Sequence, residues 1–310
     1  MKINKRYFNQ IKVDCNKGTI EKKSMNIDKF IGEIKWYLEL PLELQYYVPR
    51  VFEYSLDRND AFIKMEYYGY PCLSSIYLNE SCKADFWNDI LDSIFFVIND
   101  MKKYKKIDDG NTSAEMYCTK TINRLEEIRK NPEFRNYFNE KIIINSKEYE
   151  PLNYYIEKIK KINIPIDSLS IIHGDFCLSN ILYDLKNRII KLIDPRGKFG
   201  KYTIYGDLRY DLAKLSHSFN GNYELIINDL FTIKTYKNKI FFNLFDSEYK
   251  KKVRKMFNSR LKKEYPKEIN TINLIEALLF LSMIPLHKDF VDRQKVMFAI
   301  GIEKIARCLN

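Results

Sequence analysis

The residues best suited to chemistry lie near the middle of the chain, where an amide and a carboxylate fall at one end of a predicted hairpin. Two apolar runs with β-strand character, 180–183 and 189–193, flank a short and mostly polar connection, which is the pattern of a hairpin. If the runs pair antiparallel around that turn, Asn180 lies opposite Ile193. Asp194 therefore lies next to Asn180.

A second carboxylate precedes the hairpin. The sequence His-Gly-Asp at His173 to Asp175 forms a loop on the same side. One carboxylate can orient an attacking hydroxyl and accept its proton, while an Asn oxygen and another carboxylate can hold Mg²⁺ against nucleotide phosphates. Asp175, Asn180 and Asp194 together therefore predict magnesium-dependent phosphoryl transfer. The alternative is a polar loop of the kind found in any α/β protein.

These motifs resemble those of a known family. The run HGDFCLSN at 173–180, followed by IDPRG at 193–197, resembles the signature of the kinase-like small-molecule phosphotransferases, the aminoglycoside phosphotransferase and choline kinase superfamily. The resemblance implies a bilobal, protein-kinase-like α+β fold. Its small β-rich nucleotide-binding lobe would span 1–69. A larger, mostly helical lobe with the catalytic loop and the acceptor pocket would span 70–310.

The resemblance also implies roles for individual residues. Asp175 would be the catalytic carboxylate, and His173 would brace its loop. Asn180 and Asp194 would ligate Mg²⁺, with ATP in the cleft between the lobes. Asp211, in the first turn of a later helix, would hydrogen-bond the catalytic loop as a structural support.

The N-terminal region contains a candidate ion pair. Apolar residues recur at helical spacing through 27–40, and Glu33 shares their inward side. A buried carboxylate is costly unless a cation meets it. The preceding strand candidate, 19–23, offers Lys22 or Lys23; strand alternation and the resemblance both favour Lys22 as the lysine that holds the ATP phosphates. The alternative is that both lysines are solvated and Glu33 is partly exposed.

Two further features of this region bear on the nucleotide. Runs 8–13 and 19–23 predict a hairpin that could lie over it, although the triple-glycine loop of protein kinases is absent from the sequence. Residues 61–68 predict the last strand of the lobe. The resemblance makes the end of this strand the hinge, whose backbone groups would hydrogen-bond an adenine edge. The hinge residues are then Met65, Glu66, Tyr67 and Tyr68.

The stretch after the hairpin indicates the acceptor. Seventeen positions separate Asp194 from Asp211, too few for the peptide platform of a protein kinase, so a small-molecule acceptor is expected. Arg196 could bind an anionic acceptor group or a phosphate. The alternative, to which we give equal weight, is that it forms a structural salt bridge. Asp207, within the stretch covered by the resemblance, is a second candidate substrate residue. The YYGYP and IDPRG motifs look most like those of bacterial kinases of capsule and surface-glycan biosynthesis, which implies a sugar or an amino alcohol; aminoglycosides and choline stay open.

The remainder of the chain is predicted to be mainly helical. Apolar spacing indicates a helix at 86–95 and two core helices within 270–306, separated near Pro285. Residues 131–165 are polar and lysine-rich and predict no clear element. We expect them to supply part of the acceptor pocket or its lid.

Composition limits the class of protein. The chain has 310 residues, of which 45% are hydrophobic and 30% charged, as in an ordinary globular protein. No apolar signal core opens the sequence, and the apolar run 275–286 is too short to span a bilayer, so a cytoplasmic location without membrane insertion is expected. Six scattered cysteines without a C-x-x-C pair suggest neither a zinc site nor a disulfide framework.

The net charge of +11 comes mostly from lysines beside acidic residues on predicted helices, which favours solvated helix faces over a nucleic-acid site. Such a charge fits phosphorylated or nucleotide-linked ligands. The sequence therefore predicts an enzyme that uses ATP and Mg²⁺ to phosphorylate a hydroxyl of a small molecule. The alternative from another class is a catalytically inactive nucleotide-binding or scaffold protein, but such proteins usually lose one of the residues that are present here.

Overall fold

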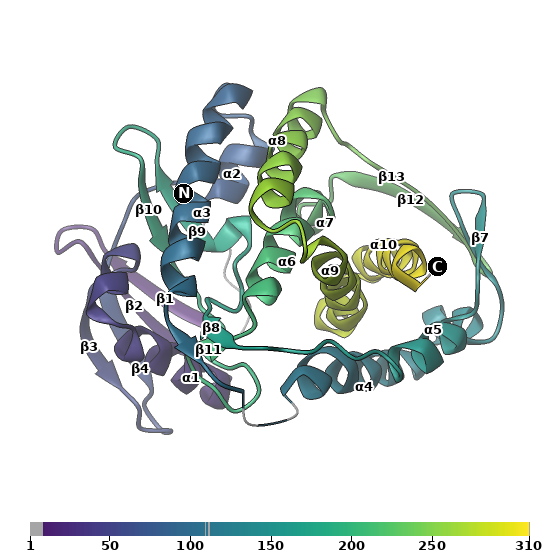
Figure 1. Ribbon diagram of the computed structural model, residues 1–310, viewed down its shortest axis with the longest axis horizontal. Helices are drawn as coiled ribbons and strands as arrows, with labels where there is room; N and C mark the ends of the chain where they lie inside the picture. The colour runs from purple at the N-terminus through teal and green to yellow at the C-terminus, as the bar shows by residue number, and fades with distance from the viewer. Residues whose placement is uncertain (1–8, 109, 111, 310) are drawn as a thin grey trace. The chain divides into compact units, whose positions relative to one another are not determined.

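The computed structural model describes residues 9–108, 110 and 112–309 (Figure 1). These residues form two compact units. The first comprises described residues up to Cys82 together with 88–107 and 168–211, and the second comprises those within 83–87, 108–167 and 212–310. The predicted boundary after residue 69 does not separate these units. The physical reason is that the segments around Ile172 and Asp194 contact Lys22, Trp36 and Tyr37 of the N-terminal region.

An antiparallel four-stranded sheet opens the first unit, in the order β1-β2-β4-β3. Its strands are β1 (Asn9–Asp14), β2 (Thr19–Ser24), β3 (Val51–Ser55) and β4 (Phe62–Glu66). Strands β1, β2 and β4 confirm the three predicted strands, apart from Phe8, which lies outside the described residues. β3 has no counterpart in the sequence prediction.

Helix α1 (Ile27–Glu39) confirms the predicted amphipathic helix. It ends just before Leu40 because the residue preceding a proline, here Pro41, is disfavoured in helical conformation. Its buried face includes Glu33 among aromatic and aliphatic side chains. The other helical segments of this unit are η1 (Leu42–Tyr47), α2 (Leu73–Leu78) and, beyond its first residue, α3 (Trp87–Lys102).

A small sheet and a hairpin carry the predicted catalytic segment. The sheet has the order β11-β8-β5, and the hairpin pairs β9 with β10. Strand β8 is the central strand of the sheet, and the chain leaves it directly into the loop that contains Asp175. The elements are β5 (Lys105–Lys106), β8 (Leu169–Ile171), η5 (Leu178–Asn180), β9 (Ile181–Asp184), β10 (Ile189–Leu192) and β11 (Tyr205–Gly206). Helix α6 (Leu208–Phe219) begins in this unit and ends in the second.

The second unit is mainly helical, as predicted. Its core contains α9 and α10, which pack against each other and confirm the two helices expected near the C-terminus. Its helical segments are η2 (Ala84–Phe86), η3 (Ala114–Thr119), α4 (Lys120–Arg129), η4 (Pro132–Phe138), α5 (Leu152–Ile159), α7 (Tyr223–Ile227), α8 (Glu248–Glu264), α9 (Ile269–Met283), η6 (Ile284–His287) and α10 (Val291–Leu309).

This unit also contains a four-stranded sheet that the sequence did not predict, in the order β12-β13-β6-β7. Its strands are β6 (Ile142–Ile144), β7 (Lys147–Tyr149), β12 (Phe231–Tyr236) and β13 (Lys239–Leu244). The β6–β7 hairpin and α5 lie within 131–165, so that segment is ordered structure rather than an irregular connection.

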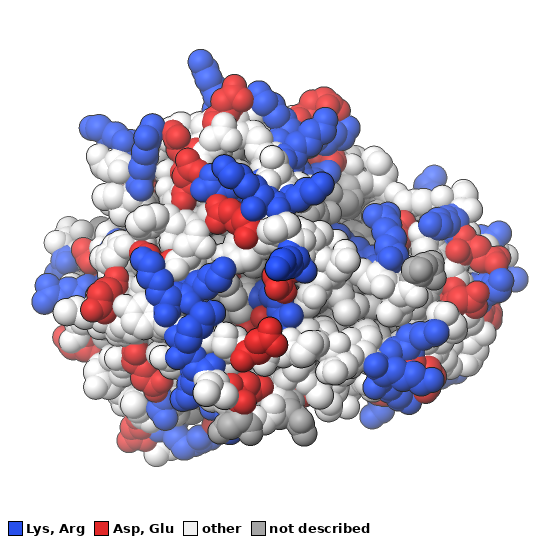
Figure 2. All heavy atoms as spheres, viewed as in Figure 1, with Lys and Arg blue, Asp and Glu red and all other residues white. Residues whose placement is uncertain are grey.

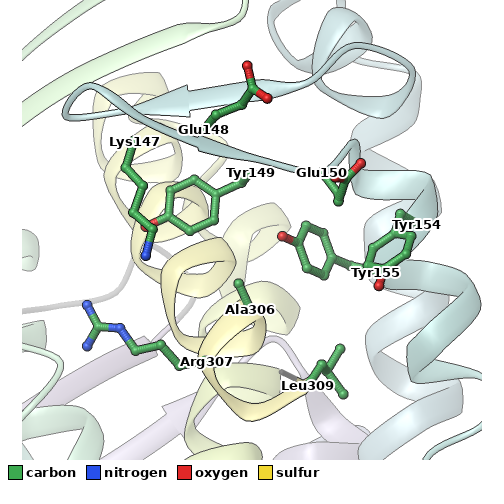
Figure 3. Close-up of a pocket in the computed structure, with 9 residues that line it drawn as sticks. All are labelled: Lys147, Glu148, Tyr149, Glu150, Tyr154, Tyr155, Ala306, Arg307 and Leu309. Atoms are coloured by element: carbon green, nitrogen blue, oxygen red, sulfur yellow. The ribbon is translucent and has the colours of Figure 1, made fainter.

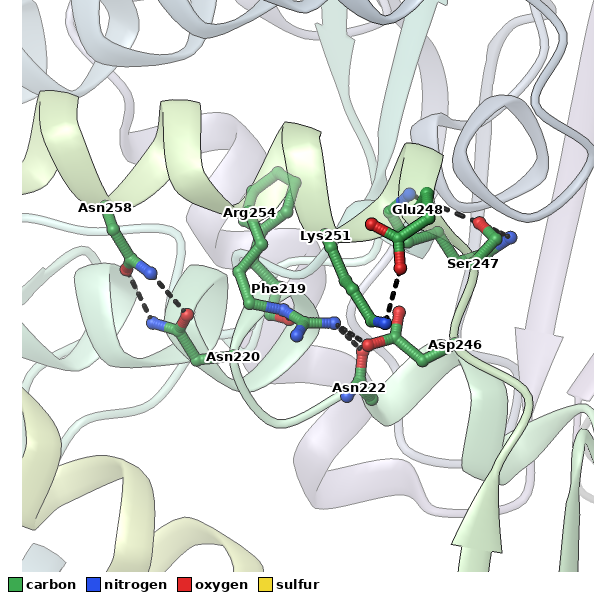
Figure 4. Close-up of polar contacts among 10 residues, drawn as sticks. Phe219, Asn220, Asn222, Asp246, Ser247, Glu248, Lys251, Arg254 and Asn258 are labelled. Carbon is green, nitrogen blue, oxygen red and sulfur yellow. Dashed lines mark hydrogen bonds and ion pairs between the residues drawn. The ribbon is translucent and has the colours of Figure 1, made fainter.

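Arg254 of α8 ties three parts of the second unit together (Figure 4). Its Nε donates to the carbonyl of Phe219 at 2.9 Å, and its Nη2 donates to Asn222 Oδ1 at 2.7 Å and Asp246 Oδ2 at 2.8 Å. Hydrogen bonds to a charged group are among the stronger ones. The guanidinium therefore anchors α8 to the end of α6 and to the segment that precedes α8.

One segment, Ile269–His287, is long and apolar enough to cross a membrane by length and composition alone. Of the window that meets this criterion, 61% is buried inside the structure, as is typical of a core helix. On the face shown in Figure 2, acidic side chains interrupt the basic ones. Helical lysines pair with acids three residues away, for example Lys251 with Glu248, which agrees with the expected solvated helix faces.

Candidate active site

The central hairpin has the predicted register. Leu192 pairs with Ile181, and the N–H of Ile193 donates to the carbonyl of Asn180 at 3.0 Å. Asn180 therefore lies opposite Ile193, and Asp194 follows directly. The short turn fixes this register. A slip of one residue would move the buried side chains of a strand to its opposite face.

Asp211 holds the catalytic loop through its backbone. The N–H groups of His173 and Gly174 donate to its two carboxylate oxygens at 2.7 and 2.8 Å. Asp211 is buried, so these charge-assisted bonds are shielded from water. The predicted structural role of Asp211 is confirmed.

His173 braces the loop as a neutral side chain. Its Nδ1 accepts from the N–H of Asp175 at 3.3 Å, and its Nε2 lies 3.0 Å from the carbonyl of Ile193. Because Nδ1 accepts, Nε2 carries the proton and donates it to that carbonyl. Burial lowers the pKa of His173 to about 4, since a charged imidazole would lose its hydration. His173 thus links the catalytic loop to the residue before Asp194 and stays neutral at physiological pH.

Gly174 is required where these two segments meet. Its φ of +76° is a conformation that side chains disfavour, and a Cβ there would lie 2.7 Å from Cβ of Arg196. The N–H of Arg196 donates to the carbonyl of His173 at 2.9 Å. The absence of a side chain at residue 174 therefore lets the segment after Asp194 lie directly against the catalytic loop.

The predicted pair of Lys22 with Glu33 forms, and Asp194 joins it. Lys22 Nζ lies 2.6 Å from Glu33 Oε1 and 2.8 Å from Asp194 Oδ1, and the Lys22 side chain is only 6% exposed. Lys23 points elsewhere: its ammonium pairs with Asp60, and its side chain is 41% exposed. The geometry therefore favours Lys22 over Lys23 as the residue that belongs to the site.

Burial and charge act in opposite directions on this pair. Burial alone would lower the pKa of Lys22, but attraction to Asp194 and Glu33 outweighs it and raises the pKa. Burial also raises the pKa of Glu33, to about 7, although Lys22 opposes that shift. Lys22 therefore remains cationic at neutral pH.

The donors at the hairpin end suit a hard cation. The Asn180 amide nitrogen donates to the carbonyl of Asp175 at 2.9 Å, so the amide oxygen faces the other way. The Asp194 side chain is 52% exposed and uses one oxygen for Lys22. In the described residues, no three His, Cys, Asp or Glu side chains gather to hold a metal. An amide oxygen and a carboxylate fit Mg²⁺, which takes few protein ligands and completes its shell with water and phosphate oxygens.

The predicted hinge offers fewer free groups than expected. The N–H of Glu66 donates to the carbonyl of Arg50, and that of Tyr67 donates to the carbonyl of Gly18, both at 2.8 Å. Met65 lies inside β4 and pairs with strands on both sides. Of the four predicted hinge residues, Tyr68 lies just beyond the strand, and the amides of Glu66 and Tyr67 are already used within the protein.

The β1–β2 turn also satisfies its own amides. The N–H groups of Asn16 and Lys17 both donate to Asp14 Oδ1 at 3.1 Å. These donors are therefore not directed at a phosphate. Among the residues that the structure describes in this unit, Lys22 is the buried cation of the site.

The two candidate substrate residues differ in their surroundings. Arg196 donates from Nε to the carbonyl of Lys198 at 2.8 Å and from Nη1 to the hydroxyl of Tyr210 at 3.2 Å, and no described carboxylate pairs with it. Asp207 is buried, and both its oxygens accept from Arg209 at 2.8 to 3.1 Å. This arrangement favours a structural role for Asp207 at the start of α6. Arg196 is the stronger candidate for binding an anion.

Two residues of α1 reach the site in a way that sequence reasoning missed. Trp36 Nε1 donates to the carbonyl of Ile172 at 2.7 Å, and the hydroxyl of Tyr37 accepts from the N–H of Asp194 at 3.1 Å. Helical spacing marks both rings as buried. Nothing in the local pattern indicates that their polar atoms contact segments so distant in sequence.

A pocket of about 250 Å³ lies in the second unit (Figure 3). It is formed by the β6–β7 hairpin, α5 and the end of α10, and Lys147 and Arg307 extend toward the same side of it. None of the predicted site residues lines this pocket.

No protein-family description and no curated protein matches the sequence. Solved structures do match. A putative aminoglycoside phosphotransferase from Ralstonia eutropha superposes with a TM-score of 0.57 at 13% identity, over 98% of this chain and 91% of that one. A thermostable mutant of the aminoglycoside phosphotransferase APH(4)-Ia gives 0.59 at 9% identity, over 97% and 93%. A choline/ethanolamine kinase family protein from Mesorhizobium loti gives 0.50 at 10% identity, over 98% and 85%.

The chain has a kinase-like fold. The predicted class, α+β with a β-rich N-terminal part and a mostly helical C-terminal part, is confirmed by these similarities and by the arrangement of its elements. Identities this low establish the architecture, whereas function depends on the chemistry of the site.

Proposed function

We propose that this protein is an ATP-dependent phosphotransferase that phosphorylates a hydroxyl group of a small molecule. The observation that carries the proposal is the meeting of Lys22, Glu33 and Asp194 beside a hairpin that places Asn180 next to Asp194. Asp175 lies at the same end of the hairpin, where the side-chain amide of Asn180 donates a hydrogen bond to its backbone carbonyl. The kinase-like fold supports this assignment, and the names of the similar structures point to small-molecule acceptors.

Asp175 would orient the acceptor hydroxyl and accept its proton, because it follows a loop held rigidly by Asp211 and His173. Lys22, kept in place by Glu33, would bind nucleotide phosphates. Asn180 and Asp194 would hold Mg²⁺, which when bound neutralises charge on the transferring phosphoryl group. Tyr68 would contact the adenine edge. Catalysis of this kind depends mainly on positioning and charge neutralisation.

For the acceptor, we propose a sugar or an amino alcohol, with a role in surface-polysaccharide biosynthesis and a cytoplasmic location, where ATP is available. Arg196 would bind a phosphate or, on an acceptor such as a sugar phosphate, its anionic group. The support is that Arg196 pairs with no described carboxylate and that its backbone lies against the catalytic loop. A guanidinium with free donor capacity suits a phosphate or carboxylate.

The test is ADP release from Mg·ATP over a panel of sugars, sugar phosphates, amino alcohols, choline and aminoglycosides. Asp175→Asn serves as the blank because it keeps the size of the side chain and removes the base. We expect turnover with at least one hydroxyl acceptor, and a loss in kcat of about 10²- to 10⁴-fold in the variant. Nucleotide affinity should change little.

Two results would count against the proposal. Turnover by Asp175→Asn equal to that of the wild-type protein would remove Asp175 from the reaction. Binding of Mg·ATP without turnover on any acceptor would favour the inactive nucleotide-binding alternative.

A further inference from the structure

Helix α1 presents four contact residues to the site. Gly32, Glu33, Trp36 and Tyr37 lie within two turns on one side of the helix, as their spacing requires. Glu33 holds Lys22, whereas the other three contact the backbone of the segments that carry the proposed catalytic residues. The helix therefore contacts the site at more points than the ion pair of Glu33 with Lys22.

The first of these backbone contacts joins two glycines. A Cβ on Gly32 would lie 2.8 Å from the carbonyl oxygen of Gly197, and a Cβ on Gly197, whose φ is +65°, would lie 2.1 Å from the carbonyl carbon of Gly32. Neither distance occurs for real Cβ atoms, so neither position accepts a side chain without movement of the backbone. Helix α1 and the loop three residues after Asp194 thus touch main chain to main chain.

The second contact acts on Asp194 itself. Asp194 has a φ of +57°, a left-handed conformation that non-glycine residues rarely adopt and that persists only where the surroundings impose it. Its N–H donates to the hydroxyl of Tyr37 at 3.1 Å. Tyr37 is buried, and burial raises its pKa, so the hydroxyl stays neutral. The bond therefore fixes the backbone from which the Asp194 carboxylate projects.

We propose that Tyr37 is a positioning residue for Asp194, and that the contact between Gly32 and Gly197 locks α1 in the position at which this bond forms. The inference deepens the proposed function and rests on it. It assigns to α1 a fixed role: the helix is held to the metal-binding segment at two backbone points and to the catalytic loop by Trp36. Asp194 is thereby oriented before any nucleotide binds.

The decisive variant is Tyr37→Phe, which removes the acceptor oxygen and keeps the ring. Calorimetric titration would compare the affinity for ADP with Mg²⁺ and without metal, so the measurement does not depend on turnover. We expect the affinity for Mg·ADP to fall about tenfold, because the backbone that orients the Asp194 carboxylate would lose its hydrogen bond to Tyr37. The affinity for metal-free ADP, which depends on Lys22, should not change.

Tyr183→Phe is the matched control. Tyr183 is a fully buried tyrosine of the same unit, and its hydroxyl lies 3.4 Å from Ser93 Oγ. This variant removes a buried hydroxyl without touching Asp194, so both ADP affinities should stay at the wild-type values. If Tyr37→Phe behaved like Tyr183→Phe, the inference would be overturned while the proposed function stood.

Gly32→Ala tests the contact between Gly32 and Gly197 by whether it raises or lowers the Tm. Alanine inside a helix normally stabilises it relative to glycine. Because the added Cβ would meet the Gly197 carbonyl, we expect a lower Tm and a weaker affinity for Mg·ADP than for the wild-type protein. A raised Tm with unchanged affinity would show that α1 is not held there. If the wild-type protein bound neither form of ADP, the proposed function would fail, and this inference with it.

Discussion

Acidification should destabilise this protein through His173, because the folded state excludes the proton that an unfolded imidazole would accept. The pKa of this side chain falls from its ordinary 6.5 to about 4 on burial, with Nδ1 and Nε2 both engaged in the loop. An imidazolium at this place would lose its hydration. Its additional proton, on Nδ1, would face the N–H of Asp175 and not a hydrogen-bond acceptor. The stability contributed by neutral His173 is therefore fully present above pH 6.5 and is lost as the pH falls from 6.5 to about 4.

The magnitude follows from the two pKa values. A difference of 2.5 units between 6.5 and about 4 corresponds to about 3 kcal/mol at most. Between about pH 7.5 and about pH 4.5, the part of this that is lost is about 2.5 kcal/mol. Because folded domains are stable by only about 5–15 kcal/mol, a loss of this size is readily measured.

Urea unfolding at a series of pH values would measure it, with His173→Gln as the comparison. Glutamine can still donate to the Ile193 carbonyl but does not titrate. The difference in unfolding free energy between wild type and variant should therefore shrink by about 2.5 kcal/mol over that interval. In parallel, the chain has three histidines, so loss of one imidazole signal in the variant assigns His173 by NMR. Equal pH slopes for the two proteins, or a His173 midpoint near 6.5, would refute the reasoning.

Three further predictions concern the proposed site. Lys22→Met should raise the KM for ATP at least about tenfold. Lys23→Met breaks only an exposed ion pair and should leave this KM unchanged, and steady-state kinetics of the two variants measures the difference. Asp211→Asn replaces one acceptor oxygen by a donor, and since a buried N–H then lacks a partner, unfolding experiments should show a loss of about 1–3 kcal/mol. Arg196→Gln should raise the KM for an anionic acceptor and leave the KM for ATP unchanged, and an equal effect on both would assign Arg196 to the nucleotide.

The local geometry of the site could be predicted from sequence because it rests on short-range rules. The register that places Asn180 opposite Ile193 follows from two short apolar runs and one tight turn. The choice of Lys22 follows from strand alternation, which turns Lys23 toward solvent. In both cases, the residues that decide the geometry lie within a single hairpin or a single strand.

Long-range organisation could not be predicted in the same way. The pair of Lys22 with Asp194 spans 172 positions, and it helps to join the hairpin to the N-terminal sheet across the expected boundary after residue 69. In the second unit, β6 pairs in parallel with β13, which lies far along the chain. The polar pair Lys237 and Asn238 between two runs rich in β-branched and aromatic residues is the local signal that could have predicted the β12–β13 hairpin.

The contacts that build the candidate site act on the backbone more than on the side chains to which we assign the reaction. Asp211 accepts hydrogen bonds from the backbone amides of His173 and Gly174. The His173 side chain donates to the Ile193 carbonyl, and the Tyr37 hydroxyl of α1 accepts from the backbone amide of Asp194. The carboxylates that we propose to take part in phosphoryl transfer are thus placed by their own main chain. Different variants should therefore change activity and stability. Asp175→Asn should lower activity and leave the loop intact, whereas Asp211→Asn should destabilise the loop itself. A site organised in this way suits phosphoryl transfer, in which positioned charge supplies most of the rate enhancement.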